Sequence, residues 1–68
     1  MTPEEVVTQA GIEGLTVANL GDWDGLKAAV AKGGPAVLTH LKDAGMTKLP
    51  DRQKVKNVLS KAQREGLL

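Results

Sequence analysis

Apolar residues recur at helical spacing along most of this chain, and the clearest run lies near its C-terminal end. The run consists of Val55, Val58, Leu59 and Ala62. Spacing of i, i+3, i+4 and i+7 places all of these side chains on one side of a helix. Gly66, four residues after Ala62, is typical of the residue in left-handed conformation that ends a helix. The pattern predicts a helix over residues 50–65, with Leu67 and Leu68 folding back onto the core.

Two further helices are predicted in the middle of the chain. The first begins after Asp22, a good N-cap residue, and the doublet Gly33-Gly34 ends it. Its apolar side consists of Trp23, Leu26, Ala29 and Val30. The second has Pro35 in its first turn, where proline is favoured, and Gly45 closes it. Its apolar side consists of Val37, Leu38, Leu41 and Ala44.

The first residues carry a helix-start signal. Thr2, Pro3 and Glu5 fit a capping box, in which the threonine caps the helix and the glutamate reaches back to it. A short apolar side of Val6, Val7 and Ala10 follows. Gly11 is typical of a helix end, so the sequence predicts a helix of about 8 residues.

Residues 11–21 allow two interpretations. Thr16 can cap a single helical turn that ends at Leu20, and the alternative is a short strand. We favour the helical turn, because the chain offers no second strand with which a first could pair.

These elements predict an all-α fold: a compact bundle of about five short helices in a single domain, residues 1–68. The turns are short, so neighbouring helices should cross at steep angles. With 68 residues the domain has little volume for a deep internal site. The chain has no cysteine and one histidine, and no catalytic constellation is apparent. We therefore expect no enzyme activity, no cofactor and no metal site.

Charge is divided unequally along the chain. Residues 1–34 hold five acids and two bases, a net charge of −3, whereas residues 35–68 hold seven bases and three acids, a net charge of +4. An acidic half joined to a basic half can support head-to-tail self-association or binding to an anionic partner. The alternative is an ordinary solvated surface of mixed charge.

Candidate partner-binding residues follow from this division. The basic candidates at the start of the last helix are Lys48, Arg52, Lys54 and Lys56, and the alternative is again a solvated helix face. The acidic candidates are Asp22 and Asp24, which flank Trp23. We expect this tryptophan, the only aromatic residue, to fill the core. We expect His40 to lie at the rim of the apolar side next to Leu41.

The stretch from Leu38 to Leu59 resembles the C-terminal half of sterile alpha motif (SAM) domains. Leu41 through Met46 is similar to the corner of leucine, small residue, glycine and apolar residue in that family, and Lys48 through Arg52 is similar to the start of its long last helix. Pro50 stands where the family usually has glycine. The match covers about half of the chain, and the N-terminal half matches weakly.

The resemblance implies a SAM-like helical bundle that acts as a protein–protein interaction module. Such domains often join a basic surface at the start of the last helix to an acidic surface in the middle of the domain. We therefore expect the chain to self-associate, in a head-to-tail polymer or scaffold, or to pair with a related helical domain. The alternative is RNA-hairpin binding through the basic face of the last helix. We expect neither a small-molecule substrate nor membrane association, and a soluble, intracellular location, cytoplasmic or nuclear, since no signal peptide and no cysteine are present.

Overall fold

The computed structural model describes residues 1–68 and contains helices but no strands. The all-α prediction is therefore confirmed. Against the prediction of about five short helices there are four α-helices, together with one short 3-10 helix where the sequence predicted a single helical turn. The elements are α1 (Pro3–Ala10), η1 (Val17–Leu20), α2 (Trp23–Lys32), α3 (Gly34–Asp43) and α4 (Leu49–Arg64).

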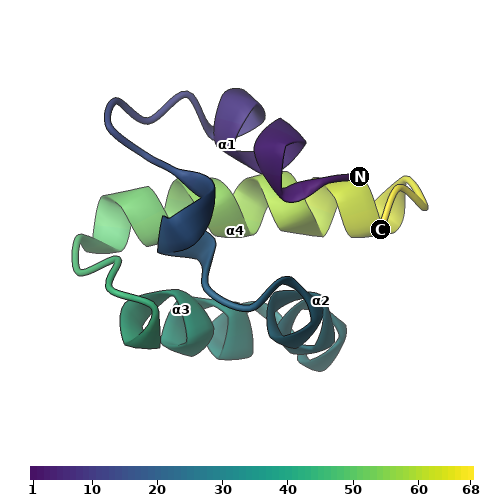
Figure 1. Ribbon diagram of the computed structural model, residues 1–68. Coiled ribbons are helices and arrows are strands. Elements are labelled where there is room, and N and C mark those ends of the chain that lie inside the picture. The colour runs from purple at the N-terminus through teal and green to yellow at the C-terminus, as the bar shows by residue number, and fades with distance from the viewer.

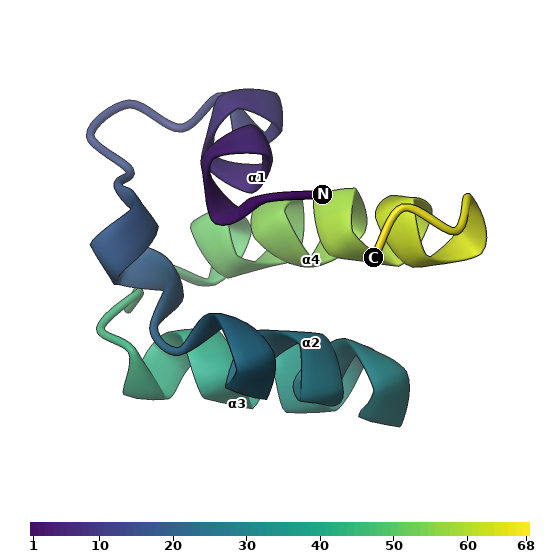
Figure 2. The same ribbon diagram turned by 45° about the vertical axis from the view of Figure 1, so that its right-hand side comes forward.

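Helix α4, with 16 residues, is the longest element and lies between the others. Figures 1 and 2 show α1 on one side of it and the pair α2–α3 on the other. In Figure 1 α4 runs across the page whereas α2 points toward the viewer, so the two helices cross steeply, as the short turns predicted. The core fills the space between these layers. It consists of Val6, Leu20, Leu26, Ala29, Val30, Val37, Leu41, Met46, Val55 and Leu59.

Side-chain hydrogen bonds cap the helices α1 and α2 where the sequence predicted their starts. The hydroxyl of Thr2 accepts the backbone N–H of Glu5 at 3.3 Å, and the Glu5 carboxylate accepts the N–H of Thr2 at 3.1 Å, which completes the capping box. A carboxylate oxygen of Asp22 accepts the N–H of Gly25 at 2.8 Å and so caps α2. At η1 the side-chain oxygen of Asn19 accepts the backbone N–H of Thr16 at 2.9 Å, but the Thr16 hydroxyl donates to the same oxygen at 3.0 Å and does not cap the helix as predicted.

Trp23 does not fill the core, contrary to the prediction. The indole is half-buried and packs against the core from outside, with the Lys27 ammonium 5.9 Å from the centre of its ring. The fully buried side chains are all leucine or valine. Trp23 is the first residue of α2, so its ring lies at the edge of the interior that these aliphatic side chains fill.

The prediction that Leu67 and Leu68 fold back onto the core is also wrong. Gly66 adopts the left-handed conformation (φ 72°), and the N–H of Leu67 then donates to the carbonyl of Ala62 at 2.8 Å. This closure satisfies the backbone at the end of α4. The chain turns back beside the end of α4 (Figure 1), and the Leu67 carbonyl accepts the Met1 ammonium at 2.7 Å, but the side chains of Leu67 and Leu68 stay 50% and 39% exposed.

Candidate interaction surfaces

Three of the four predicted basic residues lie on one side of α4. Lys48 is the N-cap residue, and Arg52 and Lys56 follow at intervals of four, so all three share one side of the helix. We call these three residues the basic stripe. Lys54 lies about 200° around the helix from Arg52, because successive residues are separated by about 100°. The structure therefore separates Lys54 from the other three.

Arg52 is held against the start of its own helix. Its Nη2 donates a long hydrogen bond of 3.5 Å to the carbonyl of Thr47, in the connection between α3 and α4. Its Nε is buried and has no hydrogen-bond partner. The guanidinium is therefore held beside the connection between α3 and α4, and its Nε is closed to solvent.

Lys56 is held at the other end of the stripe by packing. Its Cδ lies 3.1 Å from the position that a Cβ on Gly34 would occupy. Glycine at the start of α3 thus lets that helix approach the aliphatic stem of Lys56 closely. Lys56 is half-buried, as is typical of a lysine whose stem packs on a neighbouring helix.

An apolar side chain accompanies these cations. Leu49, the first residue of α4, is 47% exposed, and Pro50 beside it is exposed as well. No side chain caps this helix, since lysine at the N-cap has no acceptor atom. The start of α4 therefore presents an exposed leucine directly after Lys48 and one turn before Arg52.

The two predicted acidic residues are exposed, and both already make local contacts. Asp22 caps α2 through one carboxylate oxygen. Asp24 forms an ion pair of 3.5 Å with Lys27, and its side chain is 90% exposed. Exposed ion pairs of this kind contribute about 0–1 kcal/mol, so Asp24 can exchange its partner at little cost.

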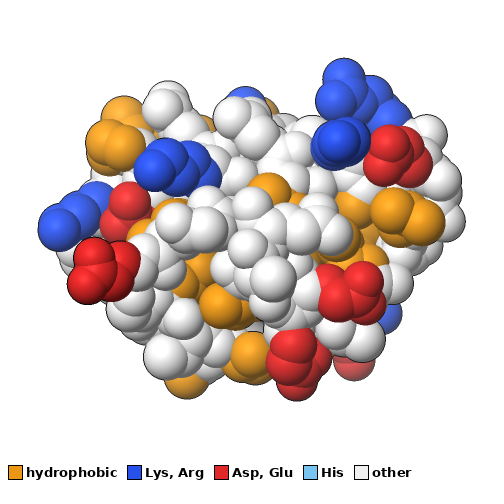
Figure 3. Space-filling view, turned by 90° about the horizontal axis from the view of Figure 1, so that it is seen from above, with side chains coloured by type: hydrophobic (Ala, Val, Ile, Leu, Met, Phe, Trp, Pro, Cys, Tyr) orange, Lys and Arg blue, Asp and Glu red, His pale blue; other side chains and the backbone are white.

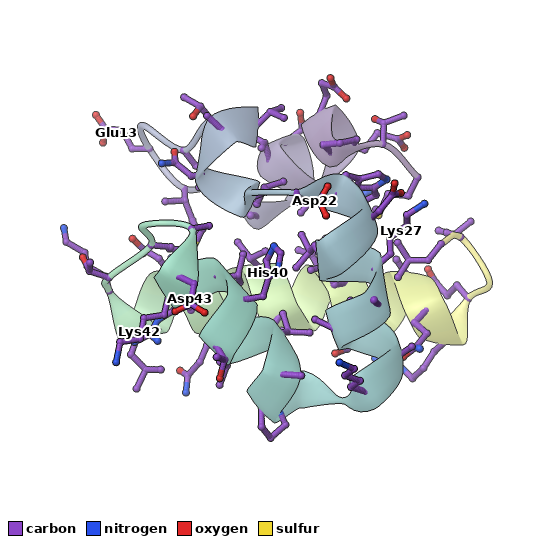
Figure 4. The ribbon with its side chains drawn as sticks, turned by 60° about the horizontal axis from the view of Figure 1, so that its bottom comes forward. Glu13, Asp22, Lys27, His40, Lys42 and Asp43 are labelled. Atoms are coloured by element: carbon purple, nitrogen blue, oxygen red, sulfur yellow. The ribbon has the colours of Figure 1, made fainter.

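Two residues that were not predicted as binding residues, His40 and Asp43, lie close to Asp22 in the structure. We call Asp22, Asp24 and Asp43 the acidic region. Asp43, at the end of α3, and His40 line the same groove between α2 and α3 as Gly25, the residue that Asp22 caps. Figure 4 shows His40 between the two helices, with Asp22 and Asp43 on either side of it. The three-residue spacing of His40 and Asp43 on a helix was the available signal in the sequence.

His40 lies half-buried beside Leu41, at the rim of the core as predicted. Its Nε2 lies 2.9 Å from the carbonyl oxygen of Leu20, which requires a proton on Nε2. A Cβ on Gly21 would be 3.2 Å from Nε2, and a Cβ on Gly25 would be 3.2 Å from Cε1. The ring therefore fits against two glycines and fixes the start of α2 relative to α3.

No ion pair joins the basic stripe to Asp22, Asp24 or Asp43 of the same molecule. The single ion pair of the structure joins Lys27 and Asp24, so no acid lies within 4.0 Å of any cation of the basic stripe. On the face that carries α1, cationic side chains gather mainly toward the two ends of the molecule, each group beside acidic ones (Figure 3). That face thus has no continuous patch of side chains with the same charge.

The structure offers no metal centre, since no three His, Asp or Glu side chains are grouped to hold an ion. None of the helices combines the length and the apolar composition that crossing a membrane requires. Comparisons with protein-family models, with curated proteins and with solved structures find no match to this chain. Function is therefore inferred from the geometry of the surfaces.

Proposed function

We propose that this chain is a SAM-like protein-interaction module that self-associates head to tail or pairs with a related helical domain. The observation that carries the proposal is the basic stripe. Lys48, Arg52 and Lys56 share one side of α4, and no acid of the same molecule pairs with them. Cations arranged in this way are available to carboxylates on another chain.

The local structure of the C-terminal half supports the SAM-like part of the proposal. The leucine-rich stretch forms α3, and the corner that follows it contains Gly45 at φ 106° and the buried Met46. The long last helix then begins at Leu49. This order of helix, glycine corner and long helix is what the resemblance implied.

The separation of charge supports a head-to-tail contact. The basic stripe belongs to α4, whereas Asp22 and Asp24 belong to the start of α2. A contact between two different surfaces does not close on itself in a pair and leaves both surfaces free at the ends. Successive copies can therefore add to an open polymer.

Light scattering over a range of protein concentration at low salt tests this proposal. The wild-type protein should form species that grow with concentration, and Arg52→Glu should remain a monomer. The matched control is Lys61→Glu, which makes the same charge change on α4 outside the basic stripe. A wild-type protein that stays monomeric at millimolar concentration would overturn self-association.

RNA is the alternative ligand of the basic stripe, since phosphates also bind unpaired cations. Its affinity for a hairpin would fall steeply with salt, by about 0.9 logarithmic units for each phosphate neutralised and each tenfold rise in salt. The net charge of +1 and the placement of Lys54 away from the stripe favour the protein partner.

A further inference from the structure

A groove lined by small side chains runs between α2 and α3. Its floor and walls include Gly25 and Ala28 from α2 and Ala36 and Thr39 from α3. Figure 4 shows the two helices diverging from the turn that joins them, with His40 in the space between. Because these side chains are short, the groove has room for a larger apolar side chain from outside.

The two ends of the groove differ in charge. Lys32 lies at the end next to the Gly33 turn. At the other end are His40 and Asp43, with Asp22 bound to the backbone of Gly25. A ligand with an apolar group and neighbouring cations would therefore place its cations at the end that carries the two carboxylates.

The same chain supplies an apolar group of that description. The large apolar side chains that remain exposed are Val17, Leu49, Leu67 and Leu68. Leu49 alone among them follows a lysine directly and has an arginine one turn further along its helix. It does not line the groove of its own molecule.

We propose that the groove between α2 and α3 receives Leu49 of a second copy, with Lys48 and Arg52 of that copy facing Asp22 and Asp43. The inference rests on the proposed self-association and identifies its apolar anchor. A leucine that moves from water into a lined groove gains from burial, while the peripheral ion pairs fix its direction. The contact thus has an apolar centre with charges around it.

Two variants test the contact from opposite sides. Leu49→Ser removes the anchor, and Ala28→Trp fills the groove with a side chain at an exposed position of α2. Each should weaken association about tenfold or more. The matched controls are Leu67→Ser, at a leucine of similar exposure, and Ala31→Trp, at an exposed alanine of α2 outside the groove. Both controls should associate like the wild-type protein.

Mixing the two blocked variants gives the decisive result. Leu49→Ser keeps an open groove, and Ala28→Trp keeps its leucine, so an equimolar mixture should form one-to-one dimers that do not grow further. Analytical ultracentrifugation measures this mass directly. If Arg52→Glu disperses the assembly while Leu49→Ser and Ala28→Trp do not, the groove is not the acceptor and self-association stands. If the wild-type protein does not associate at all, the proposed function fails as well.

Discussion

The imidazole Nε2 of His40 donates a hydrogen bond of 2.9 Å to the carbonyl oxygen of Leu20 and so ties α3 to the segment that leads into α2. The two residues are 20 positions apart in the sequence. The ring also lies close to Gly21 and Gly25, which stand on either side of Asp22 in the sequence. A single side chain in α3 thus contacts the backbone before and after Asp22 at the start of α2.

Replacement of His40 should destabilise the fold. His40→Ala leaves the Leu20 carbonyl without its donor and opens space beside two glycines, at a cost of about 1–3 kcal/mol. His40→Gln can still donate from its amide and should recover part of that loss. Urea unfolding followed by the fluorescence of Trp23, the only tryptophan, measures the free energy of unfolding. Equal stability of the wild type and both variants would show that the bond contributes nothing.

Gly21→Ala should cost more stability than Gly14→Ala. Both glycines have positive φ, 69° and 78°, and Gly21 also has ψ −151°, a region that essentially only glycine adopts, so that a side chain there costs about 1–3 kcal/mol. A Cβ at Gly21 would also be 3.0 Å from the Cβ of Ala44, whereas nothing lies within 4 Å of a Cβ at Gly14. The additional steric clash should raise the loss at Gly21 by about 1 kcal/mol or more. Equal losses in thermal unfolding would argue against this close approach of α3.

The exposure of the chain end predicts a contrast between two leucines. Leu59 is fully buried, so Leu59→Ala should lower the free energy of unfolding by about 2–5 kcal/mol. Leu67 is half exposed, and Leu67→Ala should change it by no more than about 0.5 kcal/mol. A large loss from Leu67→Ala, measured by chemical denaturation, would mean that the last residues do pack on the core.

Lys48→Asp should change stability and association in opposite directions. Lys48 has the extended backbone of an N-cap residue, and its side chain makes no capping bond. Aspartate there can accept a backbone N–H of the first turn and should stabilise α4 by about 0.5–2 kcal/mol. It also reverses one charge of the basic stripe, so self-association should weaken. A rise in melting temperature with unchanged light scattering would show that Lys48 does not contribute to the contact.

Local signals in the sequence were sufficient to predict the helices. The capping box at Thr2, the cap at Asp22 and the apolar spacing in α4 each depend on residues within one or two turns, and the structure contains all three. The boundaries of α4 differ from the prediction by one residue at each end. Short-range chemistry of this kind can be read along a chain without knowledge of its fold.

Features that depend on packing between distant segments were not predicted. Trp23 remains at the edge of the core because buried leucines and valines from all five helical elements fill the interior. The bond from His40 to Leu20 requires knowledge of how α3 meets the start of α2. The grouping of Lys48, Arg52 and Lys56 follows from helical spacing, but the absence of an internal acid beside them does not.

A reciprocal charge exchange tests the head-to-tail contact most directly. Arg52→Glu and Asp24→Lys each place a like charge against the opposing surface, so each variant alone should be monomeric at low salt. In an equimolar mixture, the Arg52→Glu protein still offers its native acidic region to the native basic stripe of the Asp24→Lys protein, and sedimentation should show a one-to-one complex. If the mixture remains monomeric under conditions in which the wild-type protein assembles, the basic stripe does not bind the start of α2.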